Sequence, residues 1–137
     1  MRVLAVDFGN FRTGIAVSDE SATLAGEAWV IQERKMSSVA AIVASEAVSR
    51  GAQAIVVGNP INMDGSIGPR ADKSEHLAEV IRSQCDIEVV LWDERLTTMS
   101  AHRILADTGR YGKKRKKNID AVAASLILES YLAFLNR

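Results

Sequence analysis

The chain has 137 residues, of which 47% are hydrophobic and 25% are charged, and its formal net charge is zero. This size and composition predict one soluble globular domain, residues 1–137, with a substantial core. No apolar run approaches the roughly 20 residues that span a bilayer, and Asp7 interrupts the N-terminal run too early for a signal peptide. The single cysteine, Cys85, excludes an internal disulfide, so we expect a cytoplasmic protein.

The N-terminal part of the sequence predicts three strands joined by short turns, near 2–8, 13–19 and 25–32. The first is a continuous apolar run, which is typical of a strand covered on both faces. It closes on Asp7, and a Gly/Asn turn then leads into the second strand. This spacing, Asp-x-Gly-x-x-x-x-Gly, places a carboxylate beside a tight hairpin, where it could hold a cation close to a phosphate.

Helices and strands alternate in the rest of the chain. A helix is predicted near 37–50, with Ser37 or Ser38 as its N-cap and Gly51 ending it. The further predicted elements are a buried strand at 54–57, a helix near 70–84, a strand at 87–92, a short helix from Thr97 or Thr98 to about Asp107, and an amphipathic helix from about Ile119. This order predicts an α/β fold with a mixed five-stranded sheet, three N-terminal antiparallel strands and helices on both faces.

Acidic residues stand at the ends of several predicted elements. Asp7 ends the first strand, Asp93 and Glu94 end the last one, and Asp120 lies at the start of the final helix. Alternation along the strand lets only one of Asp93 and Glu94 face Asp7, and it does not decide which. Asp120 could instead be an acid that the helix dipole stabilises in the first turn, with Asn118 as the N-cap, although it borders the apolar face. If these acids converge, their oxygens suit Mg²⁺ or Mn²⁺ and metal-assisted phosphodiester hydrolysis.

Basic residues are concentrated in one segment. Six of the seventeen lie between 110 and 117, which leaves a formal charge of minus six on the remainder. Such a segment predicts a local contact with a polyanion, and the alternative is a solvated linker. Arg12 and Arg95 could hold phosphates near the acids, and the loop at 62–66 could face phosphate. The candidate nucleic-acid-binding residues are Arg12, Asn62, Arg95, Lys113, Lys114, Arg115, Lys116 and Lys117.

Four motifs together resemble the YqgF family, also called RuvX. They are DFGNFRTGIAVSD at 7–19, VGNPINMDGS at 57–66, WDERLTT at 92–98 and IDAVAA at 119–124. The resemblance implies an RNase H-like fold and a bacterial cytoplasmic nuclease that matures the 5′ end of the small-subunit rRNA precursor. It also implies an acidic site formed by Asp7, Asp93, Glu94 and Asp120. Asn59 replaces the family's usual leucine and Thr13 a common isoleucine, which affects loop packing only.

Three other functions compete with the rRNA nuclease. A resolvase of branched DNA would use the same metal chemistry, but it would need two sites on a symmetric dimer, and the sequence shows no dimer face. A non-catalytic nucleic-acid or ribosome-assembly binder could share the fold, although the presence of all the acids favours catalysis. An ATP-dependent phosphotransferase of the actin-like type needs a second domain, for which this chain is too short. The sequence leaves the oligomeric state open.

Overall fold

The computed structural model describes residues 1–96 and 112–137, and for residues 112–118 it describes the backbone alone. The strands are β1 (Arg2–Asp7), β2 (Arg12–Ser18), β3 (Ala25–Gln32), β4 (Ala52–Asn59) and β5 (Glu88–Asp93). The helices are α1 (Met36–Ser49), α2 (Pro69–Arg82) and α4 (Gly112–Leu135), and a single 3₁₀ turn, η1 (Glu94–Leu96), follows β5. Within the described residues no helix is both long and apolar enough to cross a bilayer.

The five strands form one mixed sheet in the order β3-β2-β1-β4-β5. β1 pairs antiparallel with β2, which pairs antiparallel with β3, whereas β1 with β4 and β4 with β5 are parallel. The predicted mixed sheet is therefore confirmed, together with its three antiparallel N-terminal strands. Two register pairs matter for the site: Asp7 lies opposite Gly14, and Val6 lies opposite Val57, which puts Gly58 next to Asp7.

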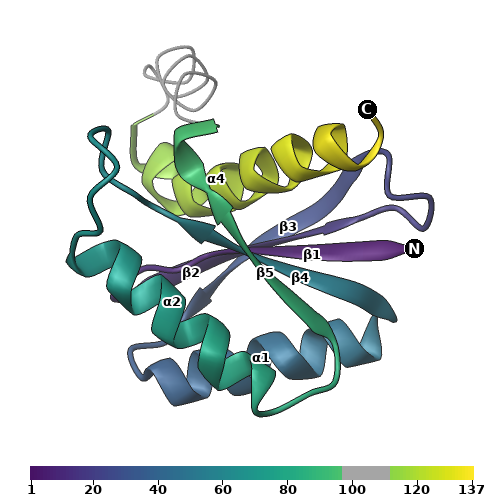
Figure 1. The fold of residues 1–137 in the computed structure, drawn as a ribbon, viewed down its shortest axis with the longest axis horizontal. Helices are drawn as coiled ribbons and strands as arrows, with labels where there is room; N and C mark the ends of the chain where they lie inside the picture. The colour runs from purple at the N-terminus through teal and green to yellow at the C-terminus, as the bar shows by residue number, and fades with distance from the viewer. Residues whose placement is uncertain (97–111) are drawn as a thin grey trace.

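Helices cover both faces of this sheet. Figure 1 shows α4 on one side and α1 and α2 on the other. Because side chains alternate along a strand, β1 contributes to two cores. Leu4 and Val6 pack in the cluster under α1 and α2, while Val3 and Ala5 pack in the cluster under α4. All four are fully buried, and burial of each Val or Leu side chain stabilises the fold by about 1.5–3 kcal/mol.

A hydrogen bond and an aromatic contact join the end of β5 to α4. The indole Nε1 of Trp92 donates to Ser130 Oγ at 3.0 Å. The Trp92 ring also meets the Tyr131 ring edge to face, with centroids 5.2 Å apart and an interplanar angle of 87°. Edge-to-face contacts of this kind add about 0.5–1.5 kcal/mol beyond burial. They hold the carboxyl end of β5, and hence Glu94, against α4.

The start of α1 differs from the prediction. The helix begins at Met36, so neither Ser37 nor Ser38 is its N-cap, and Lys35 at the cap position makes no side-chain hydrogen bond to the helix. Instead the Glu33 carboxylate accepts the backbone N–H groups of Arg34 and Lys35, at 2.9 and 3.3 Å. The predicted stop is confirmed: α1 ends before Gly51, whose φ of +70° suits glycine.

The final helix begins earlier than predicted, at Gly112 rather than near Ile119. The segment 113–117 is therefore helical and not a linker, and Asn118 lies inside the helix instead of capping it. Asp120 falls in the third turn, beyond the first turn in which a helix dipole acts on a charge. The prediction of a short helix from 97 or 98 to 107 lies outside the described residues.

Candidate active site

Asp7 lies between two glycines on the face of the sheet that α4 covers. It follows Val3 and Ala5, which point to the α4 side, and its neighbours across the sheet are Gly14 on β2 and Gly58 on β4. Neither neighbour has a side chain, so groups from other elements can approach the sheet backbone closely on both sides of the carboxylate. We call Gly14, Asp7 and Gly58, together with the carboxylates that approach this row, the trough.

Helix α4 approaches one wall of the trough at Asp120. A Cβ atom on Gly14 would lie 1.9 Å from the Asp120 carbonyl oxygen and 2.5 Å from its carbonyl carbon, so only glycine permits this approach. Gly14 therefore lies in β2, within the strand predicted near 13–19, and the backbone of α4 rests on it. Farther along the same helix, Ala124 and Ile127 are buried in the core below α4.

Glu94 lies at the opposite wall of the trough. A Cβ atom on Gly58 would lie 3.1 Å from Glu94 Oε2, which places this carboxylate over the bare backbone beside Asp7. Asp93 is engaged elsewhere: its carboxylate accepts the backbone N–H of Arg95 at 2.9 Å and the Arg95 Nη2 at 2.7 Å. Of the two adjacent acids, the structure brings Glu94 to Asp7.

Burial disfavours ionisation of the three carboxyl groups, and repulsion from neighbouring acids adds to it at Asp7 and Glu94. The pKa of Asp7 is raised from 3.8 to about 7, first by desolvation and then by the charges of Glu94 and Asp120. Burial also raises the pKa of Glu94, to which the Asp93 charge adds, and it raises the pKa of Asp120. Acids drawn from three distant segments therefore share one electrostatic environment, which is common at functional sites.

A cation that the sequence analysis did not single out faces all three acids. Arg70 lowers the pKa of Asp7, Glu94 and Asp120 by its positive charge. It is exposed and stands in the first turn of α2, directly after Pro69. A positive charge in a first turn opposes the helix dipole by about 0.3–1 kcal/mol. This unfavourable position is the feature of the sequence that could have pointed to Arg70, because it indicates that the side chain has a role outside the helix.

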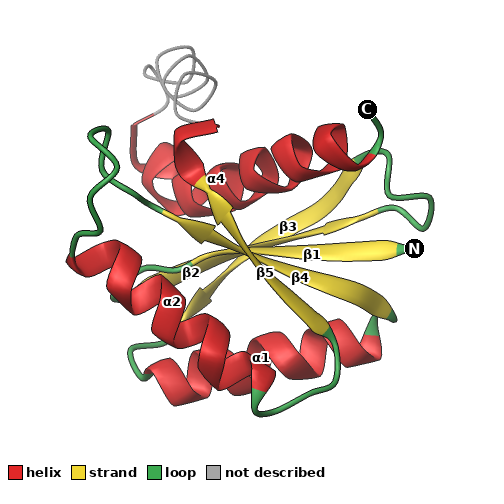
Figure 2. Ribbon diagram, in the orientation of Figure 1, coloured by secondary structure: helices red, strands yellow, loops and turns green. Residues whose placement is uncertain are grey.

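The predicted basic residues have different surroundings. Arg12 is exposed and lowers the pKa of Asp120, so it lies beside the acids. Arg95 forms the ion pair with Asp93. Asn62 is exposed, and its Nδ2 donates to Ser66 Oγ at 3.0 Å within the loop between β4 and α2, which is green in Figure 2. The side chains of Lys113, Lys114, Arg115, Lys116 and Lys117 lie outside the described residues.

The donor set of the trough suits a hard divalent cation. Its three acids offer carboxylate oxygens, which Mg²⁺ and Mn²⁺ prefer, and a cation between them would relieve the repulsion that raises the Asp7 pKa. Among the described residues, however, no three His, Cys, Asp or Glu side chains already stand at coordinating distances. The site thus has suitable ligands without a closed coordination shell.

Known proteins resemble this chain over nearly its whole length. The family model described as "RuvX: Holliday junction resolvase" matches residues 1–134. A Halothermothrix orenii protein named "Putative pre-16S rRNA nuclease" is 38% identical over 137 residues, covering 100% of this chain and 98% of the relative. A Geobacillus thermodenitrificans protein of the same name is 45% identical over 140 residues, covering 96% and 97%.

A solved structure shares the fold. The structure of T. thermophilus RuvC in complex with a Holliday junction substrate aligns with a TM-score of 0.61 at 13% identity, covering 98% of this chain and 96% of RuvC. At that identity the likeness concerns the fold alone, and it confirms the expected RNase H-like architecture. The match over nearly the whole chain, and full-length relatives well above 30% identity, show that this chain belongs to the RuvX family.

Proposed function

We propose that this chain is an endonuclease that hydrolyses phosphodiester bonds in structured RNA, and that its substrate is the precursor of 16S rRNA. The observation that carries the proposal is the trough, where Asp7, Glu94 and Asp120 come together from three distant segments, and where burial and then the charges of Glu94 and Asp120 raise the pKa of Asp7 to about 7. The names of the two relatives support the substrate. Such a substrate implies a location in the bacterial cytoplasm.

In this proposal the three acids bind the divalent cation, Mg²⁺ or Mn²⁺. A cation of this kind, when bound, activates a water molecule and stabilises the leaving oxygen. Asp7 must lose its proton to act as a ligand, and with a pKa near 7 it does so only around neutral pH until a cation binds. Glu94 and Asp120 complete the ligand set from the two walls of the trough.

The neighbouring arginines bind the substrate backbone. Arg70 is close enough to lower the pKa of all three acids, so a phosphate drawn toward it also comes to the acids. Arg12, at the start of β2, would draw a phosphate to Asp120, whose pKa it lowers. An arginine guanidinium can bind two phosphate oxygens at once, which fixes the orientation of the scissile group. Asp93 has a supporting role, because it holds Arg95.

A resolvase acting on branched DNA is the second candidate, favoured by the description of the matching family model. The test is to incubate the purified protein with precursor 16S rRNA and with a synthetic four-way DNA junction, each with Mg²⁺, Mn²⁺ or EDTA. We expect cleavage of the RNA in either ion and none in EDTA. Asp120→Asn should abolish cleavage and keep the thermal unfolding midpoint close to that of the wild type.

The other outcomes separate the alternatives. Cleavage of the junction and not of the RNA would favour the resolvase. Retained binding of RNA without cleavage in any ion would identify a non-catalytic binder and contradict the proposal. Cleavage by Asp120→Asn at the wild-type rate would remove this acid from the site.

A further inference from the structure

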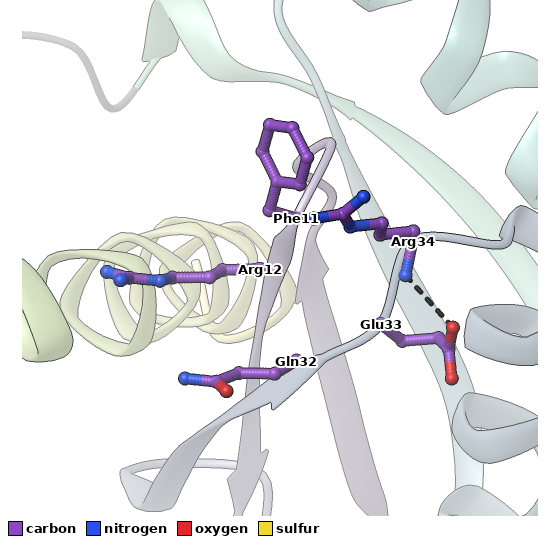
Figure 3. Close-up of a pocket in the computed structure, with 5 residues that line it drawn as sticks. All are labelled: Phe11, Arg12, Gln32, Glu33 and Arg34. Atoms are coloured by element: carbon purple, nitrogen blue, oxygen red, sulfur yellow. Dashed lines mark hydrogen bonds between the residues drawn. The ribbon is translucent and has the colours of Figure 1, made fainter.

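An aromatic ring is exposed at the tip of the hairpin that joins β1 to β2. Phe11 is 61% exposed, and the guanidinium carbon of Arg34 lies 5.0 Å from the centroid of its ring. Figure 3 shows the Arg34 side chain reaching from the segment after β3 toward Phe11. Within the described residues the Arg34 guanidinium forms no ion pair, so its hydrogen-bond donors are available to a ligand.

These two side chains border a pocket beside the trough. The pocket is open to solvent, has a volume of about 360 Å³ and is lined by Phe11, Arg12, Gln32, Glu33 and Arg34. Arg12 and Gln32 are paired across β2 and β3, and in Figure 3 both extend to the same side, toward α4. Arg12 is the residue whose charge also acts on Asp120, so the pocket and the acids are neighbours.

The chemistry of this pocket fits one class of ligand. Aromatic rings and arginine planes stack on unpaired nucleobases, and glutamine can hydrogen-bond to the edge of a base. Two arginines match the phosphates on either side of that base. The Glu33 carboxylate extends away from Arg12 and Gln32 in Figure 3, and its Oε1 accepts the N–H groups of Arg34 and Lys35. A paired base could not enter, since its faces are covered within the duplex.

We propose that this pocket binds one unpaired nucleotide next to the cleaved bond, with its base stacked on Phe11 and its phosphate held by Arg34. This inference rests on the nuclease function proposed above and adds a selection rule to it. The protein recognises the place where single-stranded RNA joins a duplex, because the stacking site and the acids lie side by side. Its substrate therefore needs a free base at a defined distance from the cut.

The test measures binding separately from cleavage, in full-length protein carrying Asp7→Asn. Two labelled RNA hairpins are compared by fluorescence anisotropy, one blunt and one with a four-nucleotide 5′ extension. Phe11→Leu keeps an apolar side chain and removes the ring, and Phe11→Tyr restores a ring. Leu24→Ala is the matched control, since Leu24 is 69% exposed at the other end of the sheet.

We expect Phe11→Leu to weaken binding of the extended hairpin by roughly five- to hundredfold, the usual range for loss of one stacked base. Its binding of the blunt hairpin should not change, and Phe11→Tyr and Leu24→Ala should bind both hairpins like the parent protein. Replacing the extension nucleotides one at a time by abasic sites should reproduce the loss at one position. At that position Phe11→Leu should have no further effect, which is the signature of a direct contact.

Two results would overturn the inference: equal affinity of Phe11→Leu and its parent for the extended hairpin, or an equal loss on both hairpins. Cross-linking gives an independent readout, because 5-iodouridine at the sensitive position should attach to residue 11. If stacking is found but wild-type protein cleaves no RNA, the pocket stands and the nuclease proposal fails. If RNA is cleaved and Phe11→Leu binds normally, the nuclease stands and the pocket fails.

Discussion

The contact between Gly14 and α4 allows a sharp test of the site, the substitution Gly14→Ala. The new Cβ would lie 1.9 Å from the Asp120 carbonyl oxygen, whereas ordinary contact begins near 3.4 Å, so α4 must move by about 1.5 Å. Overpacking of this kind costs roughly 1–3 kcal/mol of stability. A misplacement of about 1 Å at a reacting centre can cost on the order of 10²-fold in rate. We therefore expect kcat/KM for precursor RNA to fall about 100-fold.

The matched control is Gly51→Ala, which acts on stability alone. Nothing lies within 4 Å of a Cβ on Gly51, but its φ of +70° costs a non-glycine residue about 1–2 kcal/mol. Urea denaturation should show similar stability losses for both variants, and cleavage assays below their unfolding range should show a rate loss for Gly14→Ala only. Equal activity of the two variants would refute the argument that Gly14 positions Asp120.

Five further substitutions each change a single side chain. Asp7→Asn should raise the free energy of unfolding at pH 8, without divalent cation, by up to roughly 4 kcal/mol and leave it unchanged near pH 3.5, as measured with urea. The sign follows from a raised carboxyl pKa, which makes the folded wild type lose stability as the pH rises from about 4 to 7. Glu94→Gln should abolish cleavage, whereas Asp93→Asn should lower its rate by no more than about fivefold, because it breaks only the ion pair with Arg95. Arg70→Gln should shift the acid limb of the pH–rate profile to higher pH, because the charge that it removes lowers the pKa of all three acids. Asn59→Leu should raise the free energy of unfolding by about 1–2 kcal/mol, since it removes a buried amide oxygen that has no hydrogen-bond partner in the described part of the chain; a lower urea midpoint would contradict this.

The sheet could be predicted from the sequence because its central strands are buried on both faces. Val3–Val6 and Ala54–Val57 are continuous apolar runs, and almost any other structure would expose them. The start of α4 could not be found in the same way. Apolar periodicity begins only at Ile119, whereas the preceding turn and a half consists mainly of Lys and Arg, which favour helix by propensity and not by pattern.

The acids could be named from the sequence, but their arrangement could not. The choice between Asp93 and Glu94 depends on where β5 stops, and the chain leaves the strand for η1 at Glu94. The positive charge of Arg70 in a first helical turn was visible in the sequence, but its position over the acids follows from how α2 packs on the sheet. The strand around Gly14 could be predicted, but the need for glycine there could not, because it comes from the backbone of Asp120, more than a hundred residues away.

The trough exists because the sheet is mixed. At the carboxyl end of β1 the chain turns back at once, so antiparallel β2 delivers Gly14 to one side of Asp7. On the other side β4 and β5 run parallel to β1, and their carboxyl ends deliver Gly58 and then Glu94 to the same level. A purely antiparallel sheet would place a turn there instead, and a purely parallel one would lack the short return that leaves room for α4. The change of strand direction beside β1 is thus what lets three distant acids meet.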